Sequence, residues 1–200
     1  ENLPIYDKNK NKIIYKDIEY IPAIVAIYNE ILVNAKDQVT RLSELHKNDK
    51  TVNLVTEIKV TINEDTGEIS ILNNGDGIDI IEHPTETKDG KPIYIPQLIF
   101  GELLTSTNYN KNEKKIVGGK NGYGAKLTNI FSTYFKVETV DHTRGLKYEQ
   151  EFKNNMNEYN EPKITKTKSK PYTKISWITD FDRFGIDKYS NDMIKLMLRR

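Results

Sequence analysis

The sequence contains no cysteine, only three histidines and no long apolar run. The absence of cysteine excludes a disulfide scaffold, a thiol nucleophile and any zinc site built on thiolates. The histidines, His46, His83 and His142, lie too far apart in the sequence to suggest a metal cluster. No apolar segment approaches the ~20 residues that span a bilayer, and the chain starts without a signal-peptide pattern. We therefore expect an intracellular protein without a membrane partner.

Net charge is also small, because 30 Lys and Arg stand against 29 Asp and Glu, which gives +1. This balance excludes nucleic-acid binding that is driven by the net positive charge of the whole domain. One local exception is a lysine-rich stretch with lysines at positions 163, 166, 168, 170 and 174. DNA contact is one interpretation of this stretch. We favour the alternative, in which lysines on an exposed or edge strand prevent aggregation.

The 200 residues, 36% of them apolar, suit one soluble domain. The clearest predicted helix begins at Pro22 and runs to about Leu45, with an apolar stripe at helical spacing. Further helices are expected at 97–104 and 125–131, and strands at 54–62, 68–72, 135–140, 148–152, 164–167 and 173–179, with a hairpin turn at 64–67. The order of these elements predicts an α+β fold, a two-layer sandwich whose mixed, mostly antiparallel sheet is covered on one face by helices.

A polar stripe interrupts the apolar segment of the first helix. At 100° per residue, Glu30, Asn34 and Asp37 fall within about 60° of one another, and Arg41 joins the same face. A carboxylate and an amide are the side chains required for a general base and a neutral oxygen ligand to a hard cation. The alternative interpretation is a solvated helix face with an i,i+4 pair.

Two glycine-containing loops are further candidates for the functional site. The first, residues 73–77 (Asn-Asn-Gly-Asp-Gly), follows a strand, and its glycines permit positive φ and close backbone approach. Asn-Gly and Asp-Gly are also common in plain β-turns. The second, residues 118–124, holds four glycines and leads into a helix, so its N–H groups can point at phosphate oxygens, with Lys126 as a cationic clamp. It matches neither a P-loop nor a dinucleotide fingerprint, and a flexible surface loop is the alternative.

Together and in this order, these motifs resemble the ATPases of the gyrase, chaperone, histidine-kinase and MutL (GHKL) superfamily. The segments 94–109, 118–127 and 129–132 narrow the resemblance to the ATPase domain of eukaryotic-type DNA topoisomerases II. It extends from about Ile21 to the end of the chain. The resemblance implies the Bergerat-type sandwich fold, with ATP and Mg²⁺ as cofactors.

The resemblance also implies a role for each matching residue. Glu30 would orient and deprotonate the attacking water, and Asn34 would hold Mg²⁺. Asn73 would recognise the adenine amino group, and Thr173 would support the adenine pocket through water. Lys126 would clamp the triphosphate. The other implied nucleotide contacts are Ser106, Thr107 and Asn108 at the ribose and phosphates, and a lid of Gly119, Lys120, Asn121, Gly122, Tyr123, Gly124 and Ala125 that ends in Lys126.

The chain departs from the family pattern at three positions. Thr107 replaces a common Ser and Lys120 replaces an Arg, and both changes are chemically mild. Asp76 stands where relatives usually carry Lys or Arg, so it removes a positive charge from the rim of the nucleotide pocket.

The chain reads as a piece of a longer protein, because it starts without Met and residues 192–200 read as the opening of a helix. We expect residues 1–20 to be a shortened N-terminal arm, 21–185 the ATP-binding domain, and 186–200 the start of a truncated transducer region. The full protein would be a homodimer that acts on DNA, in the nucleus or, for a viral enzyme, in the cytoplasm. The piece alone would be monomeric and weakly active. A mismatch-repair or chaperone ATPase, or a non-hydrolysing ATP-binding switch, are the alternatives.

Overall fold

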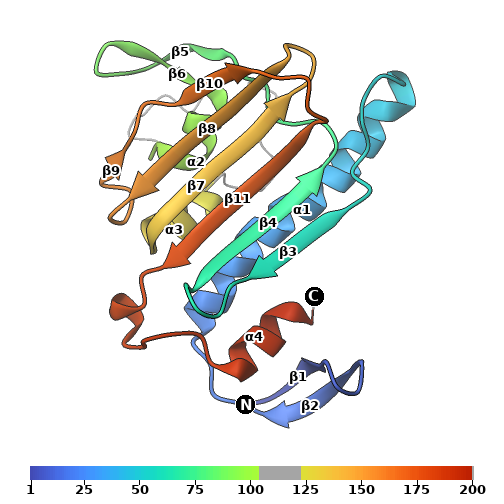
Figure 1. The fold of residues 1–200 in the computed structure, drawn as a ribbon, viewed down its shortest axis with the longest axis vertical. Helices are drawn as coiled ribbons and strands as arrows, with labels where there is room; N and C mark the ends of the chain where they lie inside the picture. The colour runs from blue at the N-terminus through green and yellow to red at the C-terminus, as the bar shows by residue number, and fades with distance from the viewer. Residues whose placement is uncertain (104–122, 200) are drawn as a thin grey trace.

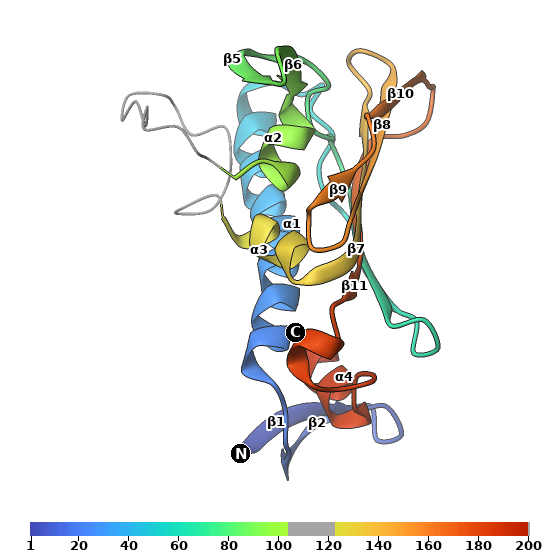
Figure 2. The same cartoon turned by 90° about the vertical axis from the view of Figure 1, so that its left-hand side faces the viewer.

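The computed structural model describes residues 1–103 and 123–199. Its centre is a seven-stranded sheet in the order β10-β8-β7-β11-β4-β3, with β9 paired to β8, and all of these pairs are antiparallel (Figure 1). The helices α1, α2 and α3 lie on one face of this sheet (Figure 2). The predicted two-layer α+β sandwich is therefore confirmed.

The bounds of most predicted elements are also close to the expectation. The helices are α1 (Pro22–Asn48), α2 (Ile95–Gly101), α3 (Gly124–Ile130) and α4 (Asn191–Leu198), with a 3₁₀ turn at Asp182–Phe184. The strands of the large sheet are β3 (Ile58–Ile62), β4 (Glu68–Asn74), β7 (Ser132–Asp141), β8 (Leu146–Lys153), β9 (Glu158–Tyr159), β10 (Lys163–Lys166) and β11 (Tyr172–Thr179). Two separate hairpins are formed by β1 (Asn2–Asp7) with β2 (Lys12–Asp17) and by β5 (Glu82–Lys88) with β6 (Lys91–Tyr94).

The main core lies between α1 and the inner face of the sheet. The apolar stripe of α1 is buried there, and the ring of Tyr28 lies 6.4 Å from that of Trp177 on the central strand β11. Trp177 and Phe135 on β7 are fully buried. Because each such side chain contributes about 1.5–3 kcal/mol when buried, this layer fixes the position of α1 on the sheet.

A second, smaller core joins the two ends of the described chain. Ile5 and Ile18 from the hairpin segment pack with Val25 of α1 and Leu196 of α4, and all four are buried. Lys16 also pairs with Asp192 at 2.9 Å. Residues 1–20, which were expected as an arm, thus contain a hairpin that packs against the C-terminal helix.

Three local differences from the expectation have physical causes. The strand expected at 54–62 begins at Ile58, because the Asn74 side chain accepts hydrogen bonds from the backbone N–H groups of Thr56 and Glu57. The β5–β6 hairpin was not expected, since its strands are mostly polar. The helix expected at 97–104 begins earlier, at Ile95, with Pro96 in its first turn. In the described part of the chain, no helix is both long and apolar enough to cross a membrane.

Candidate functional site

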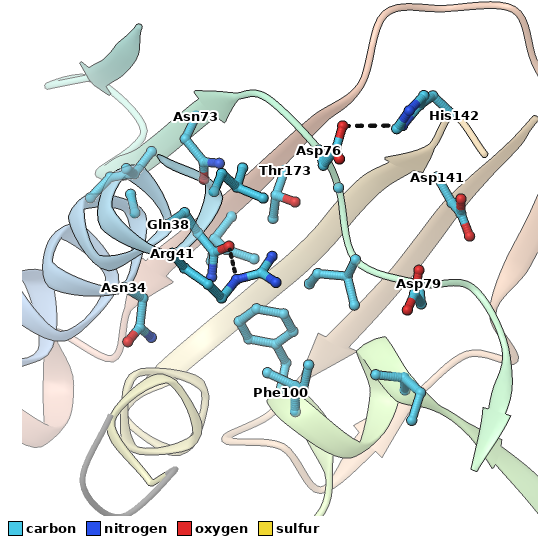
Figure 3. Close-up of a pocket in the computed structure, with 18 of the residues that line it drawn as sticks. Asn34, Gln38, Arg41, Asn73, Asp76, Asp79, Phe100, Asp141, His142 and Thr173 are labelled. Atoms are coloured by element: carbon cyan, nitrogen blue, oxygen red, sulfur yellow. Dashed lines mark hydrogen bonds and ion pairs between the residues drawn. The ribbon is translucent and has the colours of Figure 1, made fainter. Parts of the chain in front are cut away.

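A cavity of about 320 Å³ opens between α1 and the strand ends of β4, β7 and β11 (Figure 3). Its apolar wall includes Ile31, Ile71, Phe100 and Ile175. Polar side chains in the lining come from α1, from the ends of β4, β7 and β11, and from the segments that follow β4 and β7. A concave site with an apolar wall and polar groups that can orient a ligand is typical of small-molecule binding.

The polar face of α1 supplies Asn34, Gln38 and Arg41 to the cavity. Gln38 Oε1 accepts a hydrogen bond from Arg41 Nε at 2.8 Å, which orients the guanidinium. Burial lowers the pKa of Arg41, while the carboxylates of Asp76 and Asp79 act in the opposite direction. Arg41 stays charged, because an arginine loses its proton only far above neutral pH. The other two residues of the predicted polar stripe, Glu30 and Asp37, are exposed and are not among the lining residues.

The opposite end of the cavity is built by paired strands. Asn73 at the end of β4 is buried and lies directly opposite Thr173 of β11 in the sheet register. The Thr173 hydroxyl lies 2.9 Å from that of Thr139, which also accepts a hydrogen bond from the backbone N–H of Ile78. These contacts hold an amide and a hydroxyl side by side at the cavity wall. Such a pair can bind the polar edge of a nucleobase.

Glu30 lies one helical turn before Asn34 and against the first residue of α3. A Cβ added at Gly124 would collide with the carboxylate of Glu30, so any larger residue at this position would displace the Glu30 side chain. The hydroxyl of Thr128 on α3 donates to the backbone carbonyl of Ile27 on α1 at 2.9 Å. This buried hydrogen bond fixes α3 beside the turn of α1 that carries Glu30.

Lys126 is buried within α3. Burial lowers the pKa of its ammonium, and the carboxylate of Glu102 opposes that effect. Glu102 follows α2 and accepts hydrogen bonds from Lys88 and Gln97, both at 2.9 Å. Of the other predicted lid residues, Tyr123 is exposed and Ala125 is buried. Ser106, Thr107, Asn108, Gly119, Lys120, Asn121 and Gly122 lie outside the described residues.

Asp76, the departure noted in the sequence, anchors the rim of the cavity. Its carboxylate accepts hydrogen bonds from the Asn53 backbone N–H at 3.1 Å and side chain at 2.7 Å. His142, at the start of the turn between β7 and β8, lies 3.3 Å from the same carboxylate (Figure 3). Asp76 therefore joins three segments that are distant in the sequence.

The comparisons with known proteins identify the family of the chain. DNA topoisomerase 2 of Acanthamoeba polyphaga mimivirus is 49% identical over 189 residues, which are 94% of this chain and 14% of the viral protein. The crystal structure of the ATPase region of Saccharomyces cerevisiae topoisomerase II superposes with a TM-score of 0.81 and 41% identity. It covers 100% of this chain, which spans 49% of that structure.

The chain belongs to the ATPase region of the DNA topoisomerase II family. No protein-family model matches it. The ATPase domain of gyrase B from Thermus thermophilus, at 24% identity and a TM-score of 0.58, shares the fold. The predicted GHKL-type fold and the predicted family are thus confirmed.

The structure brings Asn34, Asn73 and Thr173 to one cavity, and it places Glu30 beside Gly124. The sequence analysis missed several residues of the site, among them Gln38 and Thr139. Gln38 follows Asn34 at i+4, so helical spacing could have found it. Thr139 could not be found in this way, because its partners Ile78 and Thr173 are 61 and 34 residues away.

Proposed function

We propose that this topoisomerase II-type chain binds ATP with Mg²⁺ and hydrolyses it. In the full-length protein this hydrolysis would drive the passage of one DNA duplex through another. The chain spans only 14% of the mimivirus relative, so the activity of the whole protein rests on its likeness to such relatives. The resemblance of residues 94–109 to topoisomerases favours this function over a mismatch-repair or chaperone ATPase.

One observation carries the proposal. Glu30 lies against the glycine that begins α3, one turn of α1 before Asn34, and Asn34 lines the cavity together with Asn73 and Thr173. A nucleotide with its base at Asn73 and its phosphates toward Asn34 would direct its terminal phosphate toward Glu30. Glu30 would then orient the attacking water and accept its proton, while Lys126 would bind phosphate oxygens.

The residues of the cavity fit Mg²⁺ bound together with a nucleotide. In the described ranges, no group of three or more His, Cys, Asp and Glu side chains could hold a metal ion on its own. Mg²⁺ usually takes one or two protein oxygens together with substrate phosphates. Asn34 would supply the amide oxygen for this arrangement. When bound, the ion would offset the negative charge of the phosphates.

The division of the chain follows the same proposal. Residues 21–185 form the nucleotide-binding unit, residues 1–20 an arm, and residues 186–200 the start of a transducer region. In the full-length protein we propose a homodimer whose clamp closes on ATP binding, with DNA as the substrate. A cellular protein of this kind would act in the nucleus and a viral one in the cytoplasm.

The test is single-turnover phosphate release from ATP by the full-length protein, as the wild type and as Glu30→Gln. This change keeps shape and hydrogen bonding but removes the base, so we expect hydrolysis to slow by ~10²-fold or more with little change in ATP affinity. Glu44→Gln is the matched control, because Glu44 is an exposed glutamate on the same helix. An unchanged rate in Glu30→Gln would refute the base assignment. Binding without phosphate release in the wild type would identify a non-hydrolysing switch instead.

A further inference from the structure

The inner face of β7 changes from apolar to polar toward the end of the strand. Phe135 and Val137 are fully buried in the main core, and the alternation of side chains along a strand places Thr139 and Asp141 on the same face. Both polar residues are also buried, with exposed fractions of 0% and 4%. Burial of a hydroxyl and a carboxylate is unfavourable unless each finds hydrogen-bond partners, so packing alone does not explain these two positions.

Their partners lie in residues 76–80, the segment that follows β4 and forms one wall of the cavity. The backbone N–H of Ile78 donates to Thr139 Oγ1 at 2.9 Å, and the backbone N–H of Ile80 donates to Asp141 Oδ2 at 3.0 Å. Two alternate N–H groups of the segment thus meet two alternate side chains of the strand. Between these two fully described segments there is no backbone–backbone hydrogen bond, so side chains make the connection.

Charged side chains add two contacts between the same segments at the rim of the cavity. Arg144 Nη1 lies 3.0 Å from Asp79 Oδ1, and His142 Nδ1 lies 3.3 Å from Asp76 Oδ1 (Figure 3). Almost every residue of the segment is therefore held from the end of β7 or from the turn that follows it. We define the β7 clip as these four contacts: Ile78 with Thr139, Ile80 with Asp141, Asp79 with Arg144, and Asp76 with His142.

Asp141 is the only charged member of the β7 clip that is buried. Its side chain is 3% exposed, whereas the other charged side chains of the clip are 19–65% exposed. The same carboxylate accepts hydrogen bonds from the Arg144 backbone N–H at 3.1 Å and from Arg144 Nη1 at 2.8 Å. Burial acts to raise the pKa of Asp141, but the hydrogen bonds from Ile80 and Arg144 outweigh burial and hold the pKa below its ordinary value. The carboxylate is therefore ionised at neutral pH, and its hydrogen bonds are of the strong, charge-assisted kind.

We propose that Asp141 is a positioning residue for the nucleotide, because it holds residues 76–80 in the conformation that forms the cavity wall. The inference rests on the proposed function, in which this cavity binds ATP. Without the carboxylate, the buried N–H of Ile80 would lose its acceptor, and the segment would move to expose this group to water. The apparent affinity for the nucleotide would then fall with the fraction of molecules in which the wall is formed. Glu30 and Lys126 lie on α1 and α3 and take no part in the clip, so the chemical step should be retained.

The test is steady-state ATP hydrolysis by the full-length protein, together with calorimetric titration of a non-hydrolysable ATP analogue. The test variants are Asp141→Ala and Thr139→Val, and each removes one backbone acceptor of the clip. Thr139→Val also keeps the shape of the side chain, so it tests the clip even if Asp141→Ala folds poorly. We expect KM for ATP to rise and the analogue affinity to fall by roughly tenfold, with kcat within about twofold of the wild type.

The matched control is Asp7→Ala. Asp7 also accepts hydrogen bonds from two backbone N–H groups, those of Asn9 and Lys10, and it pairs with a cation three residues later in the chain. It belongs to the β1–β2 hairpin and not to the cavity. We expect this variant to keep the wild-type KM, kcat and analogue affinity.

Hydrogen–deuterium exchange of the same proteins separates positioning from a direct contact and from a general loss of structure. In the test variants we expect faster exchange of the amides at 77–80, with exchange in the core strands of the sheet unchanged. Unchanged affinity, weaker binding without faster exchange at 77–80, or faster exchange throughout the sheet would each overturn the proposal. A wild type that does not bind the analogue would refute the proposed function and this inference with it, whereas test variants that bind it as tightly as the wild type would refute the role of Asp141 alone.

Discussion

Replacing Gly124 with Ala should slow ATP hydrolysis without lowering the stability of the fold. A Cβ at this position would meet the Glu30 carboxylate, with the carboxyl carbon at 2.6 Å and Cγ at 3.1 Å. The side chain of Glu30 must therefore move by roughly 1 Å to regain ordinary contact distances, and a misplacement of that size costs about 10²-fold in rate. Alanine has a better helix propensity than glycine by about 1 kcal/mol, so α3 should not be weakened. We expect much slower hydrolysis with an unchanged or higher melting temperature.

A double-mutant cycle shows whether this effect acts through Glu30. Single-turnover phosphate release is compared in the full-length protein for the wild type, Gly124→Ala, Glu30→Gln and the combined variant. If Gly124 matters by positioning the carboxylate, the combined variant should be no slower than Glu30→Gln, because the group being displaced is already inactive. Wild-type activity in Gly124→Ala, or additive losses in the combined variant, would refute the reasoning.

Two further predictions concern the metal and the small core. Asn34→Ala should abolish the Mg²⁺-dependent tightening of ATP-analogue binding in calorimetric titrations. The control Asn48→Ala, at the exposed end of α1, should retain this tightening. An unchanged metal effect in Asn34→Ala would exclude Asn34 as a ligand. Leu196→Ala should lower the free energy of unfolding by about 2–5 kcal/mol, because this side chain is buried against the β1–β2 hairpin. Ile13→Ala, at an exposed site of the same hairpin, should have a far smaller effect in denaturant titrations.

The sequence predicts the elements whose side chains alternate between core and solvent. α1 and the strands β4, β7, β8 and β11 follow from apolar periodicity, because their inner faces pack in the main core. The β1–β2 and β5–β6 hairpins could not be predicted in this way. They contain many charged and polar residues, and the first is fixed by contacts with α4 that lie more than 170 residues away.

The same distinction applies to the candidate site. Contacts within one helix can be predicted from the sequence, and contacts between distant segments cannot. Glu30 and Asn34 stand four residues apart on one helix, so their proximity is local and readable from spacing. The contacts of Asp76 with Asn53 and His142 and of Thr139 with Ile78 depend on how the strands assemble. Gly124 shows the same limit, because its close contact with Glu30, 94 residues earlier, depends on how α3 packs against α1.

The central claim is that the cavity between Asn34 and Asn73 is an ATP site. Its most direct test is calorimetric titration of a non-hydrolysable ATP analogue with Mg²⁺ into the wild-type chain and Asn73→Ala, with the matching GTP analogue as the control ligand. A site whose buried amide pairs with the adenine amino group should reject a base that lacks this group. We predict one-to-one binding of the ATP analogue, a loss of at least tenfold in Asn73→Ala, and weak binding of the GTP analogue. Equal affinity of the two analogues, or full affinity in Asn73→Ala, would contradict the account.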